Sequence, residues 1–161
     1  MLFRIFFFVV ISLISALSFA EIADKILVNK SEGKLYLYKN NKIFSSYSVV
    51  FGSNKIGHKE KEGDGRTPEG NYIIDNKNEN SSYYKSLHIS YPNATDIAKA
   101  KLKGISPGGE IMIHGQKNGF GWAAFITQHF NWTKGCIALS NTDMQQVWQS
   151  VNIGTSIEIK P

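Results

Sequence analysis

At 161 residues, the chain has the length of one domain with a single sizeable core. Its content of 42% hydrophobic and 19% charged residues excludes a disordered or fibrous protein. The formal net charge of +5 is scattered along the chain, and no block of Lys and Arg predicts a nucleic-acid-binding stripe. A mild positive charge suits a partner that carries carboxylates.

The first twenty residues have the pattern of a secretory signal peptide. A basic start at residues 1–4 precedes an almost unbroken apolar run, and the small residues Ser18 and Ala20 occupy the positions that a signal peptidase reads. We therefore predict cleavage after Ala20, export to the periplasm or cell wall, and a mature domain over residues 21–161 without stable membrane association. The alternative is an uncleaved anchor, which the short apolar run disfavours.

Strand patterns dominate the first half of the mature chain. Apolar and aromatic runs predict three strands at 26–29, 35–38 and 43–51. The pair Asn40-Asn41 predicts a tight hairpin, because Asn tolerates a positive φ. The Gly- and charge-rich stretch from Gly52 to Gly70 is too polar for a core element and predicts a long functional loop. Two further strands follow, at 71–75 and 86–90.

Helical periodicity appears in the second half. One helix is expected after Asn93, with an apolar face made by Ala94, Ile97, Ala98 and Leu102. A second is expected after Asn141, with its apolar face made by Met144, Val147, Trp148 and Val151. A short helix is expected at 122–128, and short strands at 110–114, 137–139 and 155–159. Together the patterns predict a single, mostly β domain of the α+β class with a few short helices.

The chain has one cysteine, Cys136. In an exported protein an odd cysteine indicates a reactive thiol, and the alternative is a buried structural residue. Gly135, directly before it, allows a carbonyl group to approach closely, and Lys134 is a nearby positive charge that favours the thiolate. An unperturbed thiol is mostly protonated at pH 7, so its use as a nucleophile requires a base.

Four histidines are candidates for that base: His58, His88, His114 and His129. His114 ends an apolar strand and is followed by Gly115, which places its ring at a sheet edge. His129 is nearer to the cysteine in sequence but belongs to an irregular stretch. Spacing alone favours His114 without excluding the others, and we interpret His58 and His88 as structural.

Two motifs in the mature chain resemble those of the L,D-transpeptidases, the YkuD-domain family. One is His114-Gly115, a gap, and then Trp-Thr-Lys-Gly-Cys-Ile-Ala at residues 132–138. The other, within residues 57–70, looks like an extended form of the family's Thr-Pro-x-Gly segment. The sequence departs from the usual pattern at Lys134, where a second His is common, and at Ala138, where Arg or Asn is common. In this form it resembles a subgroup that is widespread among exported bacterial proteins.

The resemblance implies a fold, a substrate and residue roles. The fold would be a YkuD-like mixed β-sandwich, and the partners would be peptidoglycan stem peptides. Cys136 would be the nucleophile that attacks the stem's diamino acid carbonyl and releases D-Ala, with His114 as its base. The backbone of Gly115 would orient that histidine, and the N–H groups of Gly135 and Cys136 would form the oxyanion hole.

Other side chains are weaker candidates. Thr133 and Lys134 lie beside the thiol, and Lys134 is suited to holding a stem carboxylate as a point charge. Arg66 is a candidate carboxylate clamp, and the alternative is that it pairs with Asp64 or Glu69 to fix the loop. The aromatic residues Trp122, Phe125 and Trp132 are expected to pack rather than to line a cleft. No ligand spacing predicts a metal site, and no cofactor is implied.

Three functions are compatible with the sequence. The first is an acyltransferase that forms or remodels wall crosslinks by passing the acyl group to an amine. The second resolves the same acyl-enzyme with water, as an L,D-carboxypeptidase or an amidase that releases an attached protein. The third is a catalytically silent wall-binding module, which the thiol and histidine motifs disfavour because binding requires no thiol.

Overall fold

Alternating burial builds the first two strands, as the sequence pattern predicts, whereas the third strand buries only Tyr47. The computed structural model describes residues 21–161, so the predicted signal peptide lies outside the described residues. Strands β1 (Lys25–Asn29), β2 (Lys34–Lys39) and β3 (Lys42–Ser48) form an antiparallel meander. The two residues between β2 and β3, Asn40 and Asn41, have φ values of 50° and 61°, which confirms the tight hairpin.

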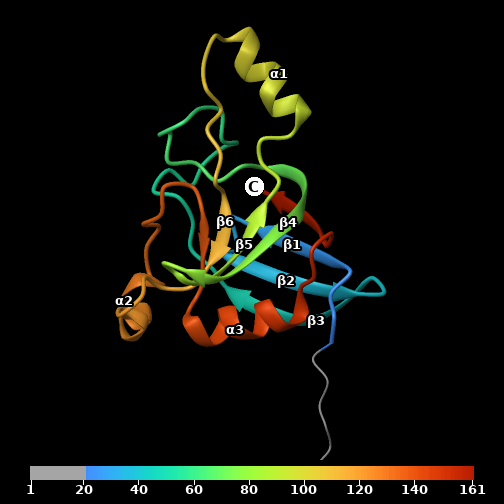
Figure 1. Ribbon diagram of the computed structural model, residues 1–161, viewed down its shortest axis with the longest axis vertical. Coiled ribbons are helices and arrows are strands. Elements are labelled where there is room, and N and C mark those ends of the chain that lie inside the picture. The colour runs from blue at the N-terminus through green and yellow to red at the C-terminus, as the bar shows by residue number, and fades with distance from the viewer. Residues whose placement is uncertain (1–20) are drawn as a thin grey trace, which may run out of the picture.

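All eight strands join in one mixed sheet with the order β3-β2-β1-β8-β4-β5-β6-β7 (Figure 1). The β1–β8 and β6–β7 pairs are parallel, and the others are antiparallel. The long strand β4 pairs with β8 over residues 70–73 and with β5 over residues 74–81. The remaining strands are β4 (Gly70–Ser81), β5 (Tyr84–Ile89), β6 (Met112–His114), β7 (Ile137–Ala138) and β8 (Ser156–Lys160). The predicted α+β class is confirmed.

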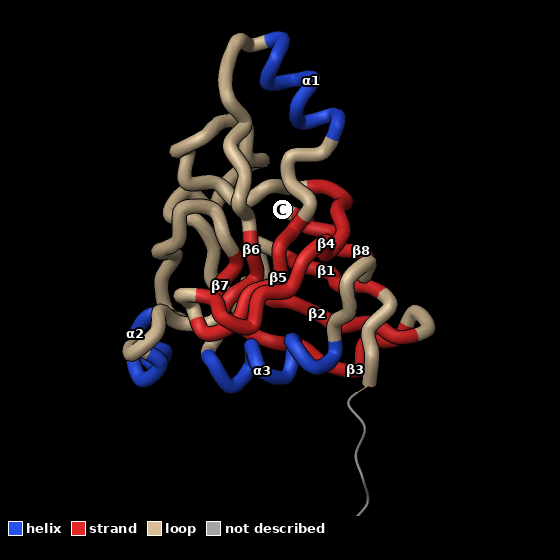
Figure 2. The backbone as a smooth tube through the Cα atoms, in the orientation of Figure 1, coloured by secondary structure: helices blue, strands red, loops and turns tan. Residues whose placement is uncertain are grey.

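Short helices surround the sheet (Figure 2). They are α1 (Ala94–Leu102), the 3₁₀ turn η1 (Gly121–Ala123), α2 (Ala124–Thr127) and α3 (Asn141–Ser150). Helix α3 packs against β5 and buries Met144 and Val147, as its periodicity predicts. Its N-cap is Ser140, whose hydroxyl accepts a hydrogen bond from the Asp143 N–H, and not the expected Asn141.

Helix α1 does not pack as its apolar pattern predicts. Ile97 and Leu102 are 51% and 89% exposed, and the buried residues of the helix are Asp96 and Ala100. Asp96 and Asn93 form a reciprocal capping box, and the Asp96 carboxylate also accepts a hydrogen bond from a tyrosine of β4. A polar contact therefore fixes the face that α1 turns inward, and the helix stands beyond the end of the sheet in Figure 1.

A single apolar core lies under the strands and α3. Its members are mostly aliphatic residues with almost no exposed surface, and each contributes roughly 1.5–3 kcal/mol by burial. They include Ile26, Val28, Leu35, Leu37, Ile74, Leu87, Ile89, Ile113, Ile137, Leu139, Met144, Val147, Ile157 and Ile159. Within residues 21–161, no helix has both the length and the apolar character needed to cross a membrane.

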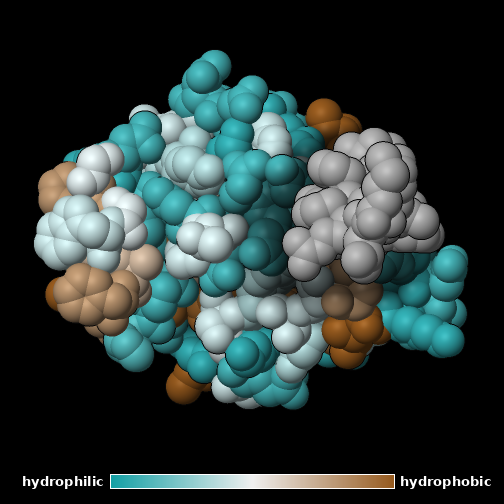
Figure 3. Space-filling view, turned by 90° about the horizontal axis from the view of Figure 1, so that it is seen from below, coloured by the Kyte–Doolittle hydropathy of each residue, from teal (hydrophilic) through white to brown (hydrophobic). Residues whose placement is uncertain are grey.

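The segment before the cysteine turn exposes apolar side chains that were expected to pack. Trp122 and Phe125 are each 67% exposed and contact one another, whereas Trp132 packs inward. Figure 3 shows apolar and aromatic side chains gathered at the left edge of the molecule, where Figure 1 places α2. The expectation of packing is therefore wrong for Trp122 and Phe125, because η1 has three residues and α2 has four, and neither element buries any of them.

Candidate active site

Close backbone packing positions the turn that carries the thiol. A Cβ atom on Gly135, which has a φ of 130°, would lie 2.7 Å from the carbonyl oxygen of Arg66. A Cβ on Gly52 would lie 2.1 Å from the carbonyl oxygen of Gly65 and 2.9 Å from the Gly135 backbone. Only glycine fits such contacts, so the two sequence motifs meet directly, backbone against backbone, just before Cys136.

The Thr133 side chain closes this turn. Its hydroxyl donates to the Cys136 carbonyl oxygen at 2.7 Å and accepts from the Gly135 N–H at 3.2 Å. Thr133 is only 5% exposed, so the structure uses its hydroxyl to shape the turn. The Gly135 N–H, a predicted oxyanion donor, is engaged by Thr133 in this state, whereas the role of the Cys136 N–H stays a prediction.

Strand register brings His114 and Cys136 to one face of the sheet. In the parallel β6–β7 pair, Ile113 pairs with Ile137 and His114 with Ala138. Both isoleucines point into the core, so the alternation of side chains sends those of His114 and Cys136 to the opposite face. The next strand, β5, places Ser86 opposite His114 and His88 opposite Met112. His88 is thus one strand farther from the cysteine turn than His114.

The environment of His114 fixes its tautomer. Its Nδ1 lies 2.7 Å from the Gly115 carbonyl oxygen, which only accepts hydrogen bonds, so Nδ1 carries the hydrogen. In the neutral ring Nε2 is therefore free to accept a proton. The ring packs against Tyr83 and Trp132, with centroid distances of 4.7 and 5.8 Å. Burial lowers the pKa of His114, and the hydrogen bond to Gly115 partly opposes this effect.

The thiol is neutral at rest. Burial raises the pKa of Cys136, and the backbone N–H of Met112 and the charge of Lys59 only partly offset this. Its Sγ donates a weak hydrogen bond to the carbonyl oxygen of Glu110 at 3.5 Å. Among the described residues it makes no hydrogen bond to His114, so the sulfur and the imidazole must come closer together before a proton can pass between them.

A cavity of about 600 Å³ opens at the sulfur. Its charged lining residues are Lys59, Glu62, Glu110 and Lys134. Lys134 is exposed and forms no ion pair with any residue of the described domain. Its ammonium group is therefore available to a substrate. We refer to this space as the Cys136 cavity.

Arg66 lies outside the Cys136 cavity and lines a neighbouring one instead. Its guanidinium makes one long hydrogen bond, 3.5 Å, to the carbonyl oxygen of His58, and its Nε is buried without a partner among residues 21–161. Neither carboxylate that the sequence suggested as a partner pairs with it in the part of the chain described. Asp64 instead pairs with Lys59, and Glu69 pairs with Lys30.

Lys59 is the site residue that the sequence analysis missed. It is 3% exposed, and its Nζ donates to Asp64 Oδ1 at 2.9 Å and to the Lys61 carbonyl oxygen at 3.1 Å. The only sequence signal for it is its place in the Gly-rich segment that contains the second motif. Its distance from Cys136 along the chain hides the fact that the two residues line one cavity.

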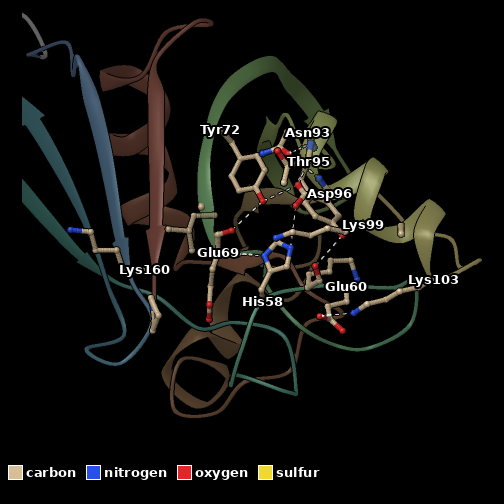
Figure 4. Close-up of a pocket in the computed structure, with 16 residues that line it drawn as sticks. His58, Glu60, Glu69, Tyr72, Asn93, Thr95, Asp96, Lys99, Lys103 and Lys160 are labelled. Carbon is tan, nitrogen blue, oxygen red and sulfur yellow. Dashed lines mark hydrogen bonds and ion pairs between the residues drawn. The ribbon is translucent and has the colours of Figure 1, made fainter.

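A second polar cluster lies in a cavity of about 540 Å³ (Figure 4), which Lys59 also lines. There the His58 Nδ1 accepts from the Glu69 N–H at 3.0 Å, and its Nε2 lies 3.1 Å from Asp96 Oδ1. The hydroxyl of Tyr72 donates to the other Asp96 oxygen at 3.0 Å. These contacts join the 57–70 loop to α1, in agreement with the structural role expected for His58. We refer to this group as the His58 cluster.

Comparison with known proteins identifies relatives of the chain. A sequence model of the YkuD family, described as the L,D-transpeptidase catalytic domain, matches residues 23–159. The chain is 29% identical over 132 residues to the "Putative L,D-transpeptidase YafK" of Escherichia coli (strain K12), covering 78% of this chain and 46% of that protein. It is 26% identical over 138 residues to the "Putative L,D-transpeptidase YqjB" of Bacillus subtilis (strain 168), covering 83% and 69%. The chain thus spans about half the length of the Escherichia coli relative.

Solved structures share the fold. The helical cell shape determining protein Pgp2 from Campylobacter jejuni has a TM-score of 0.64 and 27% identity, and the match covers 85% of this chain and 48% of that chain. The L,D-transpeptidase from Mycobacterium smegmatis has a TM-score of 0.57 at 12% identity, covering 85% and 58%, and shows the likeness of the fold alone.

Proposed function

The chain belongs to the L,D-transpeptidase catalytic domain family, and from this premise we propose that it acts on peptidoglycan stem peptides through an acyl-enzyme on Cys136. The observation that carries the proposal is the register of β6 and β7, because it turns the thiol of Cys136 and the proton acceptor of His114 toward the same face of the sheet. The thiol opens to a cavity large enough for a peptide segment.

The two pKa shifts define how the thiol is activated. Because burial raises the pKa of Cys136 and lowers that of His114, both groups are neutral at rest. The proton therefore moves from Sγ to His114 Nε2 as sulfur bonds to the substrate carbonyl carbon. The imidazolium then returns this proton to the departing amine as the C–N bond breaks. D-Ala leaves a tetrapeptide stem, and the acyl group stays on Cys136 as a thioester.

The second half-reaction transfers the acyl group. An attacking amine loses a proton to His114 as it bonds to the thioester carbon, and the thiol is regenerated with that proton when the C–S bond breaks. An amine from another stem gives a crosslink. Water gives hydrolysis, the reaction of an L,D-carboxypeptidase. We place this chemistry outside the cytoplasm, which the predicted signal peptide supports.

The test is incubation of the mature domain with purified disaccharide-tetrapeptide, followed by mass spectrometry. Loss of D-Ala together with a crosslinked dimer means transfer, which is the expected result. Loss of D-Ala alone means hydrolysis. An unchanged substrate, with no acyl adduct on Cys136, would identify a silent binding module and overturn the proposal. The Cys136→Ala variant serves as the control for contaminating activities.

A further inference from the structure

Lys59 differs in its burial from the other cationic side chains of the Cys136 cavity and of the 57–70 loop. Its ammonium group is buried, whereas Lys134, which lines the same cavity, is exposed. A buried lysine requires compensating partners, because an unpaired charge in a protein interior is unstable. Lys59 obtains them from Asp64 and from the Lys61 carbonyl oxygen. The charge is thus held at one point, without the freedom of a surface lysine.

The partner of Lys59 is itself fixed by the backbone. Asp64 accepts hydrogen bonds from the N–H groups of Glu60, Lys61 and Arg66 at 2.8–3.1 Å, in addition to the Lys59 ammonium. Burial alone would raise the pKa of Asp64, but these bonds outweigh it and lower the pKa to about 2. The carboxylate is therefore ionised at any physiological pH, and it anchors the lysine permanently.

One donor of the Lys59 ammonium remains for a ligand. An ammonium group has three N–H donors, and within residues 21–161 only two of them have acceptors. The lysine lines both cavities. In the His58 cluster, Asp96 already has hydrogen-bond partners. The Lys59 charge also acts on the Cys136 thiol, so the ammonium lies within electrostatic range of the reacting atom.

We propose that Lys59 binds the terminal carboxylate of the substrate and thereby selects peptides that end one residue beyond the carbonyl attacked by Cys136. This inference rests on the proposed function, because it takes the substrate to be a stem peptide. In such a peptide the terminal carboxylate lies within about 5 Å of the reacting carbonyl, since consecutive residues are 3.8 Å apart. A fixed cation beside the nucleophile is suited to a group at that distance.

The contact also has a consequence for specificity. A substrate whose last residue is amidated, or extended by further residues, would leave the buried ammonium with an uncharged neighbour, and binding would lose a charge-assisted hydrogen bond. Lys59 therefore makes the enzyme one that removes or exchanges the terminal residue, rather than one that cuts within a longer chain.

The test compares two peptides that differ only in charge: the tetrapeptide stem with a free D-Ala carboxylate and the same peptide with a terminal carboxamide. Binding is measured by calorimetry on the Cys136→Ala protein, so that turnover does not enter. We expect the free acid to bind at least about 10-fold more tightly, and Lys59→Met in the same background to reduce that preference to about 2-fold or less.

Lys30→Met is the matched control. Lys30 is 2% exposed and also pairs with a loop carboxylate, Glu69, but it does not line the Cys136 cavity. Its loss should destabilise the loop to a similar degree and leave the preference for the free acid intact. If Lys59→Met does not fold because Asp64 is left as an unpaired charge, Lys59→Met/Asp64→Asn removes both charges and serves in its place.

Each outcome decides the inference. Equal affinity of the parent protein for the two peptides, no binding of either one, or a preference that survives Lys59→Met would overturn it. A preference lost equally in Lys30→Met would show that loop integrity, and not the Lys59 charge, sets the preference. The proposed function is tested separately by turnover of the free acid by the wild-type protein, so the two ideas can fail independently.

Discussion

The two cavities that share Lys59 as a wall residue differ in how far their polar groups are satisfied. In the His58 cluster, both ring nitrogens of His58 and both oxygens of Asp96 have partners within 3.1 Å. In the Cys136 cavity, the thiol has one weak contact at 3.5 Å, and the His114 Nε2 is left free by the tautomer. The His58 cluster forms the larger network of contacts, yet a saturated network stabilises a structure, whereas unsatisfied groups are available for reaction.

Removal of the thiol should have the largest effect. Cys136→Ala is expected to lower turnover by at least about 10³-fold, because no other residue can form the acyl-enzyme. Its melting temperature should stay close to that of the wild type. Residual turnover above about a tenth of the wild-type rate would exclude the covalent mechanism.

Replacement of the base comes next. His114→Gln should lower kcat by about 10²- to 10⁴-fold, because the thiol is neutral at rest and loses its proton acceptor. Burial lowers the pKa of His114, so wild-type activity should persist as the pH falls and should drop only below the ordinary histidine value of about 6.5. The pH–rate profile of the variant should lack this loss of activity at low pH. A midpoint above 6.5 in the wild type would contradict the assigned environment.

The His58 cluster should respond in the opposite way. Asp96→Asn weakens the contacts to His58 and Tyr72 and should destabilise the fold by about 1–3 kcal/mol, measured by chemical denaturation. The kcat of the folded protein should change less than about 3-fold. A large loss of kcat at unchanged stability would break the distinction between the two cavities.

The smallest effect is expected at Lys134. This lysine is exposed, so solvent and salt screen its charge. Lys134→Met should raise KM by roughly 2- to 5-fold with little change in kcat, and the difference should shrink as the salt concentration rises. Slower alkylation of Cys136 by a neutral reagent in the absence of substrate would instead assign Lys134 to thiol activation.

The sequence was sufficient for features that depend on local chemistry. The Asn40-Asn41 turn, the buried face of α3 and the α+β class follow from φ preferences and periodicity, whereas the mixed sheet was implied by the family resemblance. The choice of Cys136 and His114 as the reacting pair rested on their motif, and the register supports it while their roles stay predictions.

The features that the sequence did not reveal arise from contacts between distant segments. Helix α1 has an apolar stripe, but its orientation follows from Asp96, whose partners His58 and Tyr72 come from a loop and a strand. Lys59 lines the same cavity as the thiol because the glycine contacts bring the 57–70 loop against the cysteine turn. Secondary-structure propensity and hydrophobic periodicity carry no information on contacts between segments that are distant in sequence.

The backbone contact among Gly52, Gly65 and Gly135 also restricts how this protein can diversify. A Cβ on Gly52 or Gly135 would collide with main-chain atoms, and those atoms cannot move aside without displacing the loop or the turn. Substitutions there should be purged by selection or rejected in a directed-evolution library. New substrate preferences would then have to arise through the exposed positions at the mouth, such as Glu62 and Lys134, which leave the inner wall unchanged.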